Sequence, residues 1–443
     1  MSPQEMAEAA DERDRVGEFP TRPMFRHYGR ITRSTGSIVR ATGSFCVGEI
    51  CAITRTHQDA LLAEVVGFDN GEMLLVPYGS AKGISYHSVI SSAMREFKIP
   101  VGDQLVGRVL DAWGKPIDAG VPIDGEMQYP VHRIPPNPMS RPPIDRPFIT
   151  GIRALDGVLT FGQGQRVGIF AAAGGGKSTL IASLVKNAIY DCCVVALIGE
   201  RGREVREFVD LHLGSQGMAR SVVVIATSDR PAIEQVKAAH SATAIAEFFR
   251  DEGRQVLLIM DSLTRFSRAQ RQIGLSAGEP PTRRGFPPSV FEQLPALLER
   301  TGNTETGSIT AIYTVLVEGD DMNEPVADEA RSLLDGHIIL SRKLAGAGHY
   351  PAIDVVASAS RVVSNVADAD HLTAMRKLRA LISKYDELEL LVRIGEYVAG
   401  SDPEGDDAVA RIDAINGFLR QDMNVPSSFE KTILDLKQAV FDA

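Results

Sequence analysis

Six short apolar runs separated by helical patterns dominate the middle of the chain. They are QRVGIF (165–170), CVVALIG (193–199), VVVIAT (222–227), VLLIMD (256–261), ITAIYTVL (309–316) and HIILS (337–341). Runs of this length that are apolar almost throughout are typical of strands buried on both faces of a sheet. Because helical patterns separate them, they predict a parallel sheet with crossover helices, which is the α/β fold class.

Shorter β-type runs precede this region, and only helical patterns follow it. GSIVR, GEICAI, ALLAEVVGF and EMLLV lie within residues 26–100, where DNG at 69–71 is a hairpin signal. We expect a small β-barrel or sandwich over residues 26–100, an α/β domain over 101–365 and a C-terminal helical domain over 366–443. The proline-rich stretch 133–147 is expected to be a strap, and residues 1–25 a flexible arm.

A phosphate-binding loop is predicted directly after the first of the six strands, in FAAAGGGKST (170–179). It matches the pattern G-x-x-x-x-G-K-[ST] except that Ala171 replaces the first glycine. The following pattern, STLIASLVKNAIY, predicts a helix whose N-terminus would add its positive dipole end to the loop. The lysine would reach the β- and γ-phosphates of ATP, and the serine would ligate Mg²⁺. The nucleotide-binding candidates are Ala172, Ala173, Gly174, Gly175, Gly176, Lys177, Ser178 and Thr179.

Two acidic residues at strand ends complete the predicted chemistry. Asp261 closes the run VLLIMD and is the candidate carboxylate for the Mg²⁺ shell, because α/β sheets bind ligands at the carboxyl ends of their strands. Glu200 follows CVVALIG and is the candidate general base or water-positioning residue. Arg201, the next residue, is a further catalytic candidate.

Composition excludes several classes of protein. The chain has 443 residues and a formal net charge of −10, which is the wrong sign for a protein that acts by neutralising nucleic-acid phosphates. No apolar run approaches the roughly 18 residues of a membrane span, and the acidic N-terminus is unlike a secretory signal. We therefore expect a cytoplasmic protein that binds no nucleic acid.

The assembled motifs resemble a known family. GERGRE (199–204), GRVLDAWGKPID (107–118), the phosphate loop with Asp261, and YPAIDVVASAS (350–360) are similar to the rotary-type ATPases that include the F- and V-type catalytic subunits. The chain resembles most the export branch, the ATPases of type III protein secretion and flagellar assembly, which typically carry alanine where Ala171 stands. RIGEYVAGSD and SRVVSNV are more similar to the injectisome members than to the flagellar ones.

The resemblance implies further residues and an assembly. It implies a RecA-like core with an N-terminal β-barrel, and a homohexamer with ATP sites between subunits. Tyr350 matches the aromatic that stacks on adenine, and Arg361 matches the arginine finger that reaches the neighbouring subunit's site.

The family likeness also implies the protein's surroundings. Such a motor lies at the cytoplasmic face of the inner membrane, where it releases chaperones from export substrates and unfolds the substrates. Its implied partners are a central-stalk coiled-coil protein, a stator-like regulator at the N-terminal arm, the export gate and chaperone–substrate complexes.

Three alternatives remain at this point. A flagellar protein export ATPase would carry the same motifs. A hexameric RNA helicase of the terminator type shares a similar core, but the N-terminal runs lack basic residues interleaved with aromatic ones. A ring subunit that binds nucleotide without hydrolysing it would have no need of a general base such as Glu200.

Overall fold

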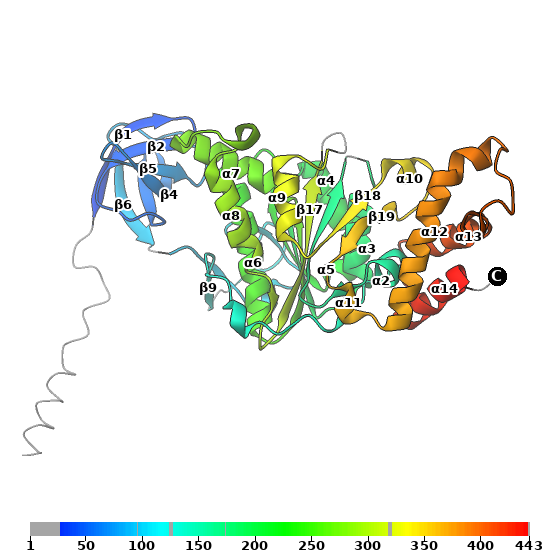
Figure 1. The fold of residues 1–443 in the computed structure, drawn as a ribbon. Helices are drawn as coiled ribbons and strands as arrows, with labels where there is room; N and C mark the ends of the chain where they lie inside the picture. The colour runs from blue at the N-terminus through cyan, green and yellow to red at the C-terminus, as the bar shows by residue number, and fades with distance from the viewer. Residues whose placement is uncertain (1–26, 95, 124–126, 173, 318–320, 442–443) are drawn as a thin grey trace, which may run out of the picture. The chain divides into compact units, whose positions relative to one another are not determined.

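The computed structural model describes residues 27–94, 96–123, 127–172, 174–317 and 321–441. They form two compact units, one ending at Glu96 and the other beginning at Phe97. The predicted arm, residues 1–25, lies outside the described residues. The predicted boundaries of the domains stay a prediction, while the predicted order of barrel, parallel-sheet core and helices is confirmed (Figure 1).

The first unit is a closed antiparallel barrel. Its strands follow the order β1-β2-β5-β4-β3-β6, and apolar side chains from them fill its interior. The bounds are β1 Tyr28–Thr35, β2 Ile38–Thr42, β3 Ile50–Arg55, β4 Gln58–Asp69, β5 Glu72–Pro77 and β6 Val89–Met94.

The predicted hairpin is present between β4 and β5. Asp69 pairs with Glu72, and the two residues between them, Asn70 and Gly71, have φ values of 51° and 80°. Two consecutive residues with positive φ make the tight turn that matches the twist of antiparallel strands, which is why Asn-Gly is favoured there.

The second unit is built on one mixed sheet, which has nine strands among the described residues. Seven neighbouring strands are parallel, and β19 joins them antiparallel to β18. In spatial order the sheet contains β19 Ile353–Ser360, β18 Gly336–Leu340, β12 Arg166–Ala171, β17 Ser308–Leu316, β15 Gln255–Asp261, β13 Cys192–Ile198, β14 Ser221–Ala226 and β8 Val109–Asp111; β16 Gly302–Asn303 pairs with β17.

All six predicted strands of the core are present, and three further strands were not predicted. β8 has only three residues and β16 two, which is too short for a periodicity to be recognised. β19 mixes alanine and serine with exposed positions such as Val356, because it forms the edge of the sheet, so it lacks the uniformly apolar pattern of the central strands.

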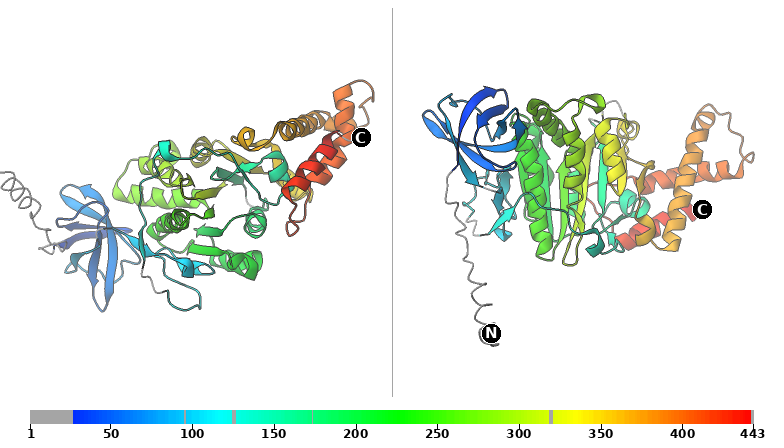
Figure 2. Two further views of the ribbon diagram at one scale, coloured as in Figure 1. Left: turned by 90° about the horizontal axis from the view of Figure 1, so that it is seen from below. Right: turned by 60° about the vertical axis from the view of Figure 1, so that its left-hand side comes forward.

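Helices cover both faces of this sheet (Figure 2). α6, the longest of them, packs on β13, β14 and β15. The bounds are α2 Arg153–Val158, α3 Lys177–Asn187, α4 Gly202–Glu207, a π-helix Phe208–Leu213, α5 Gly214–Met218, α6 Ala232–Asp251, α7 Leu263–Ala277, α8 Pro288–Leu298, α9 Pro325–Leu333, α10 Arg342–Gly346 and α11 Val363–Val366. Short elements flank the proline-rich strap: β7 Lys98–Pro100, β9 Gln128–Pro130, β10 Pro147–Phe148 and β11 Phe161–Gly162.

The predicted C-terminal helical region is present and contains three long helices among the described residues. α12 (Ala369–Arg393), α13 (Pro403–Leu419) and α14 (Phe429–Phe441) pack on one another and on α2, at the β19 side of the sheet (Figure 1). Their apolar side chains, Leu378, Phe418 and Leu436 among them, belong to the same buried cluster as those of the sheet. Within the described part of the chain, no helix has the length and apolarity needed to cross a bilayer.

A buried ion pair joins α6 to the end of α8. Both nitrogens of one edge of the Arg300 guanidinium donate to Glu247, at 3.0 and 2.6 Å, and both residues are about 2% exposed or less. The ring of His240 lies beside them, with Nδ1 3.4 Å from Arg300. Burial lowers the pKa of His240 well below its usual value, which disfavours a second positive charge beside Arg300, and the counter-charge of Arg300 is the Glu247 carboxylate.

We predict that Glu247→Ala destabilises the protein. Removing one partner leaves a buried guanidinium without its counter-ion, which typically costs about 3–5 kcal/mol of unfolding free energy. The control Asp328→Ala removes the exposed ion pair with Arg331 (3.2 Å) and should cost less than about 1 kcal/mol. Urea unfolding of the full-length variants checks this, and equal shifts of the two midpoints would contradict it.

Candidate active site

The predicted site residues meet at the carboxyl edge of the parallel strands. The phosphate loop follows β12, Glu200 follows β13, and Asp261 is the last residue of β15. These strands run in the same direction, so their ends lie at one edge, although residues 172 to 261 are far apart in sequence.

The loop has the backbone conformation that its glycines were expected to supply. Gly174 and Gly176 have φ values of 85° and 82°, a region that favours glycine, and Gly176 directly precedes α3. Ala171, by contrast, is still the last residue of β12, where it pairs with Leu316 and Leu340. An extended, buried position suits a small side chain, which explains why alanine serves there. Ala173 lies outside the described residues.

Lys177 lies between two carboxylates. Its Nζ is 2.5 Å from Oδ1 of Asp261 and 3.6 Å from Oε1 of Glu200. The Thr314 hydroxyl donates to the same Asp261 oxygen at 2.7 Å and thereby fixes the orientation of this nearly buried carboxylate. The first residue of α3 thus carries a cation that is aimed at the acidic ends of two other strands.

The environment of Glu200 shifts its protonation. Burial raises the pKa of the Glu200 carboxyl above its ordinary value; the ammonium of Lys177 opposes that shift, and the charge of Asp261 adds to it. A carboxylate with a raised pKa is a stronger base than an ordinary one, which fits a group that accepts a proton from water.

These residues line a cavity of about 490 Å³. Of the predicted residues, those around it are Ala172, Gly174, Gly176, Lys177, Ser178, Thr179, Glu200, Arg201 and Asp261. The Arg201 side chain is 77% exposed and pairs only loosely with Glu204, at 3.4 Å. It borders the cavity, but within the described residues its side chain forms no hydrogen bond or ion pair with Glu200 or Lys177, so a catalytic role for Arg201 stays a prediction.

Tyr350 lies beside the loop. A methyl group placed on Gly176 would come within 3.5 Å of the Tyr350 ring, and the residue is 43% exposed. The ring therefore borders the phosphate loop, and the residue remains partly exposed.

Arg361 lies at the N-terminal ends of the parallel strands, opposite the carboxyl ends where the phosphate loop lies. It follows β19, whose last residue Ser360 pairs with Gly336, and its N–H donates to Asp335 O at 2.9 Å. Asp335 in turn bonds to Arg166, the first residue of β12, whereas the loop follows the last residue of that strand. The length of β12 separates the two edges by roughly 17 Å. The site of this chain is therefore not brought together with its own Arg361.

Two side chains at the site were not found from the sequence. Thr314 orients Asp261 from β17, and Arg265 lines the cavity from α7, one helical turn after Asp261. The Nε of Arg265 is buried and has no hydrogen-bond partner among the described residues. The spacing of Arg265 from Asp261 in DSLTR was the available signal, but a helical arginine is common on any surface.

The oxygen donors of the cavity suit Mg²⁺. The Ser178 hydroxyl and the Asp261 carboxylate both line it, and Mg²⁺ prefers such hard oxygen ligands. Within the described residues, no group of three or more His, Cys, Asp or Glu side chains could hold a metal ion. At nucleotide sites Mg²⁺ is usually bound by one or two protein ligands together with water and phosphate oxygens, so a pair such as Ser178 and Asp261 fits it.

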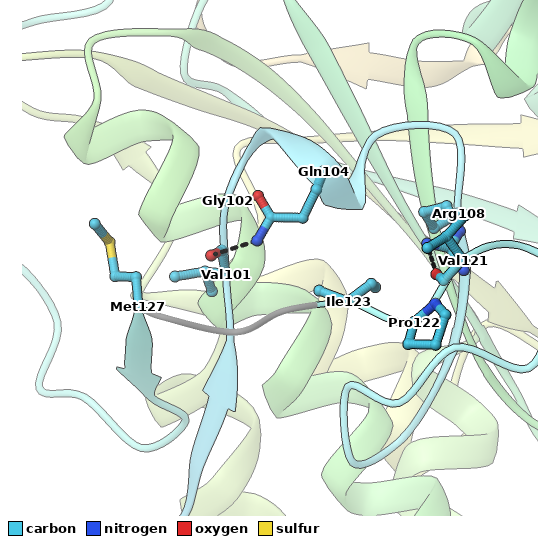
Figure 3. A pocket seen from close by; sticks show the side chains of 8 residues that line it. All are labelled: Val101, Gly102, Gln104, Arg108, Val121, Pro122, Ile123 and Met127. Carbon is cyan, nitrogen blue, oxygen red and sulfur yellow. Dashed lines mark hydrogen bonds between the residues drawn. The ribbon is translucent and has the colours of Figure 1, made fainter.

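A second cavity, of about 550 Å³, lies near the edge strand β8 (Figure 3). Among the described residues that line it, Arg108 alone is charged, and it is held by Asp118 at 2.6 Å and by the Val121 carbonyl at 2.8 Å. Arg108 is thus bound within its own segment, whereas the first cavity gathers Lys177, Glu200 and Asp261.

Comparison with known proteins gives two family matches. The ATP synthase alpha/beta family nucleotide-binding domain matches residues 151–360, and the T3SS EscN ATPase C-terminal domain matches residues 367–438. The type 3 secretion system ATPase of Xanthomonas euvesicatoria is 52% identical, over 96% of this chain and 97% of the relative. The flagellum-specific ATP synthase of Bacillus subtilis is 48% identical, over 93% and 95%.

Solved structures are similar over nearly the same length. The assembled ATPase EscN of the enteropathogenic E. coli type III secretion system superposes with a TM-score of 0.89 at 48% identity, covering 93% of this chain and all of that one. EscN in complex with its central stalk EscO gives a TM-score of 0.86 at 47% identity, with the same coverage.

Proposed function

The chain belongs to the family of type 3 secretion system ATPases and is an ATP hydrolase, and we propose that it hydrolyses ATP with Glu200 as the base. The observation that carries this assignment is the position of Lys177, 3.6 Å from Glu200 and 2.5 Å from Asp261 at the start of α3. A phosphate loop, a metal-binding carboxylate and a base of raised pKa thus share one cavity.

Each group has a defined task in this proposal. The N–H groups of the loop and Lys177 would bind the phosphates, while Ser178 and Asp261 would hold Mg²⁺, which would supply positive charge to neutralise the phosphate oxygens. Glu200 orients the attacking water and accepts its proton. Arg265, with its buried Nε, adds positive charge on the side of the cavity next to Glu200.

We propose that Arg361 acts on the site of a neighbouring copy. Its position at the opposite edge of the sheet supports this, because a chain that carries the loop at one edge and the finger at the other can complete each site in a ring of identical subunits. A homohexamer is the assembly that we propose.

We further propose that the ring serves an injectisome in the cytoplasm, bound peripherally at the inner membrane. The higher identity to the Xanthomonas relative than to the flagellum-specific one supports the injectisome over a flagellar role. The EscN–EscO complex supports a central-stalk partner. A stator-like regulator at the arm, the export gate and chaperone–substrate complexes are proposed from the family alone.

We predict that Lys177→Ala abolishes ATP hydrolysis. The variant loses the ammonium that faces the phosphates, and it leaves Asp261 and Glu200 without their shared cation. Phosphate release from MgATP measures the effect. Lys186→Ala, in the last turn of the same helix, should retain activity, and near-normal turnover of Lys177→Ala would refute the site.

We predict that ATP hydrolysis is lost on acidification at a higher pH than it would be if the base were a glutamate of ordinary pKa. The ionised form of the base is active, so raising the pKa of Glu200 moves the acidic limb of kcat/KM above the usual value of about 4.3. Glu200→Gln should lower kcat by about 10²–10⁴-fold, whereas Glu207→Gln, an exposed neighbour paired with Arg203, should not. An acidic limb at or below the usual value would contradict the role of Glu200.

We predict that two inactive variants restore activity when they assemble together. Arg361→Ala should lower turnover by ~10³-fold or more. Co-assembly with Lys177→Ala places an intact loop beside an intact finger, so phosphate release should reappear. The control mixes Lys177→Ala with the double variant Lys177→Ala/Arg361→Ala and should stay inactive. If the first mixture also stays inactive at every ratio, Arg361 does not act across an interface.

A further inference from the structure

The segment between α13 and α14 holds a glutamine with an unusually complete set of partners. Gln421 Nε2 donates to Gly151 O and to Val425 O, each at 2.8 Å, and its Oε1 accepts from Arg153 N at 2.7 Å. The amide therefore ties its own loop to the turn that begins α2. The use of both amide groups fixes the orientation of the side chain.

The backbone of the same residue contacts the nucleotide site. Gln421 N donates to Tyr350 O at 3.0 Å, so the residue that carries the proposed adenine-stacking ring is bonded to the C-terminal segment. The Gln421 side chain thus fixes the same residue whose backbone N–H bonds to Tyr350.

The loop is also fixed to the helix of the phosphate loop. The Met423 carbonyl accepts from Ser183 Oγ at 2.9 Å and from Asn187 Nδ2 at 3.1 Å, both on α3. Next to them Pro426 packs tightly on Gly151, where an added methyl group would lie 3.1 Å from the proline ring. Residues 421–426 thus bridge α3, the start of α2 and Tyr350.

We propose that Gln421 is a positioning residue for the base of the nucleotide: its side-chain amide holds the loop that places Tyr350 beside Gly176. The inference rests on the proposed stacking role of Tyr350. It follows that the C-terminal segment influences how the adenine is bound, while binding of the phosphates depends on Lys177, Asp261 and Glu200.

The test is a double-mutant cycle on the full-length assembled protein. Gln421→Leu removes all three side-chain bonds, and Gln421→Glu keeps an acceptor for Arg153 N but cannot donate to the two carbonyls. Each should raise KM for MgATP by about fivefold or more and leave kcat within about twofold, because groups that contact only the base bind ground and transition states equally. Asn424→Ala is the matched control and should leave both constants unchanged, because among the described residues its exposed side chain bonds only to Asp422 in the same loop.

Combining the Gln421 variant with Tyr350→Ala tests whether Gln421 acts through Tyr350 or only stabilises the fold. If Gln421 acts through Tyr350, the double variant Gln421→Leu/Tyr350→Ala should have the KM of Tyr350→Ala within about twofold. Multiplying effects, or a fall in kcat without a rise in KM, would overturn the role of Gln421 while leaving the stacking role intact. If Tyr350→Ala itself leaves KM unchanged, the stacking role fails, and the inference fails with it.

Discussion

The arrangement of Lys177 between Asp261 and Glu200 depends on a constraint of the whole sheet. Three strands end at the same edge only because they are parallel, and parallel strands need crossover helices between them. The loop and Glu200 each follow a different strand and Asp261 ends a third, so no local segment could bring the three within 4 Å. The 2.5 Å contact between Lys177 and Asp261 is therefore a product of topology, with Thr314 fixing the carboxylate from a fourth strand.

The direction of β19 determines where Tyr350 and Arg361 lie relative to the site. This strand runs antiparallel to β18, so the residues before it lie at the edge of the phosphate loop and the residue after it lies at the opposite edge. Tyr350 consequently borders its own Gly176, while Arg361 faces away from its own site. The eight residues of β19 thus separate Tyr350, which lies at the site of its own chain, from Arg361, which we propose acts at the site of a neighbouring subunit.

The surroundings of Tyr350, where we propose that the adenine stacks, are formed by the C-terminal segment as well as by the sheet. Gln421 bonds to Gly151, Val425 and Arg153 through its side chain and to Tyr350 through its backbone. The helices α12–α14 share a buried core with the sheet, and the segment between α13 and α14 bonds to the Tyr350 backbone. Under the proposed roles, the adenine and the phosphates of one nucleotide would therefore be placed by different parts of the fold.

The sequence by itself determined the fold class and the phosphate end of the site. The α/β core, the barrel, the loop, Asp261 and Glu200 were predictable because apolar runs, turn residues and motif spacing are local along the chain. The edge strands β8 and β19, and the side chains Thr314, Arg265 and Gln421, were not. Their roles depend on strand order and on contacts between segments up to about 270 residues apart, such as Gln421 with Gly151. Only the tertiary structure decides those contacts, because they arise from packing and not from any local pattern.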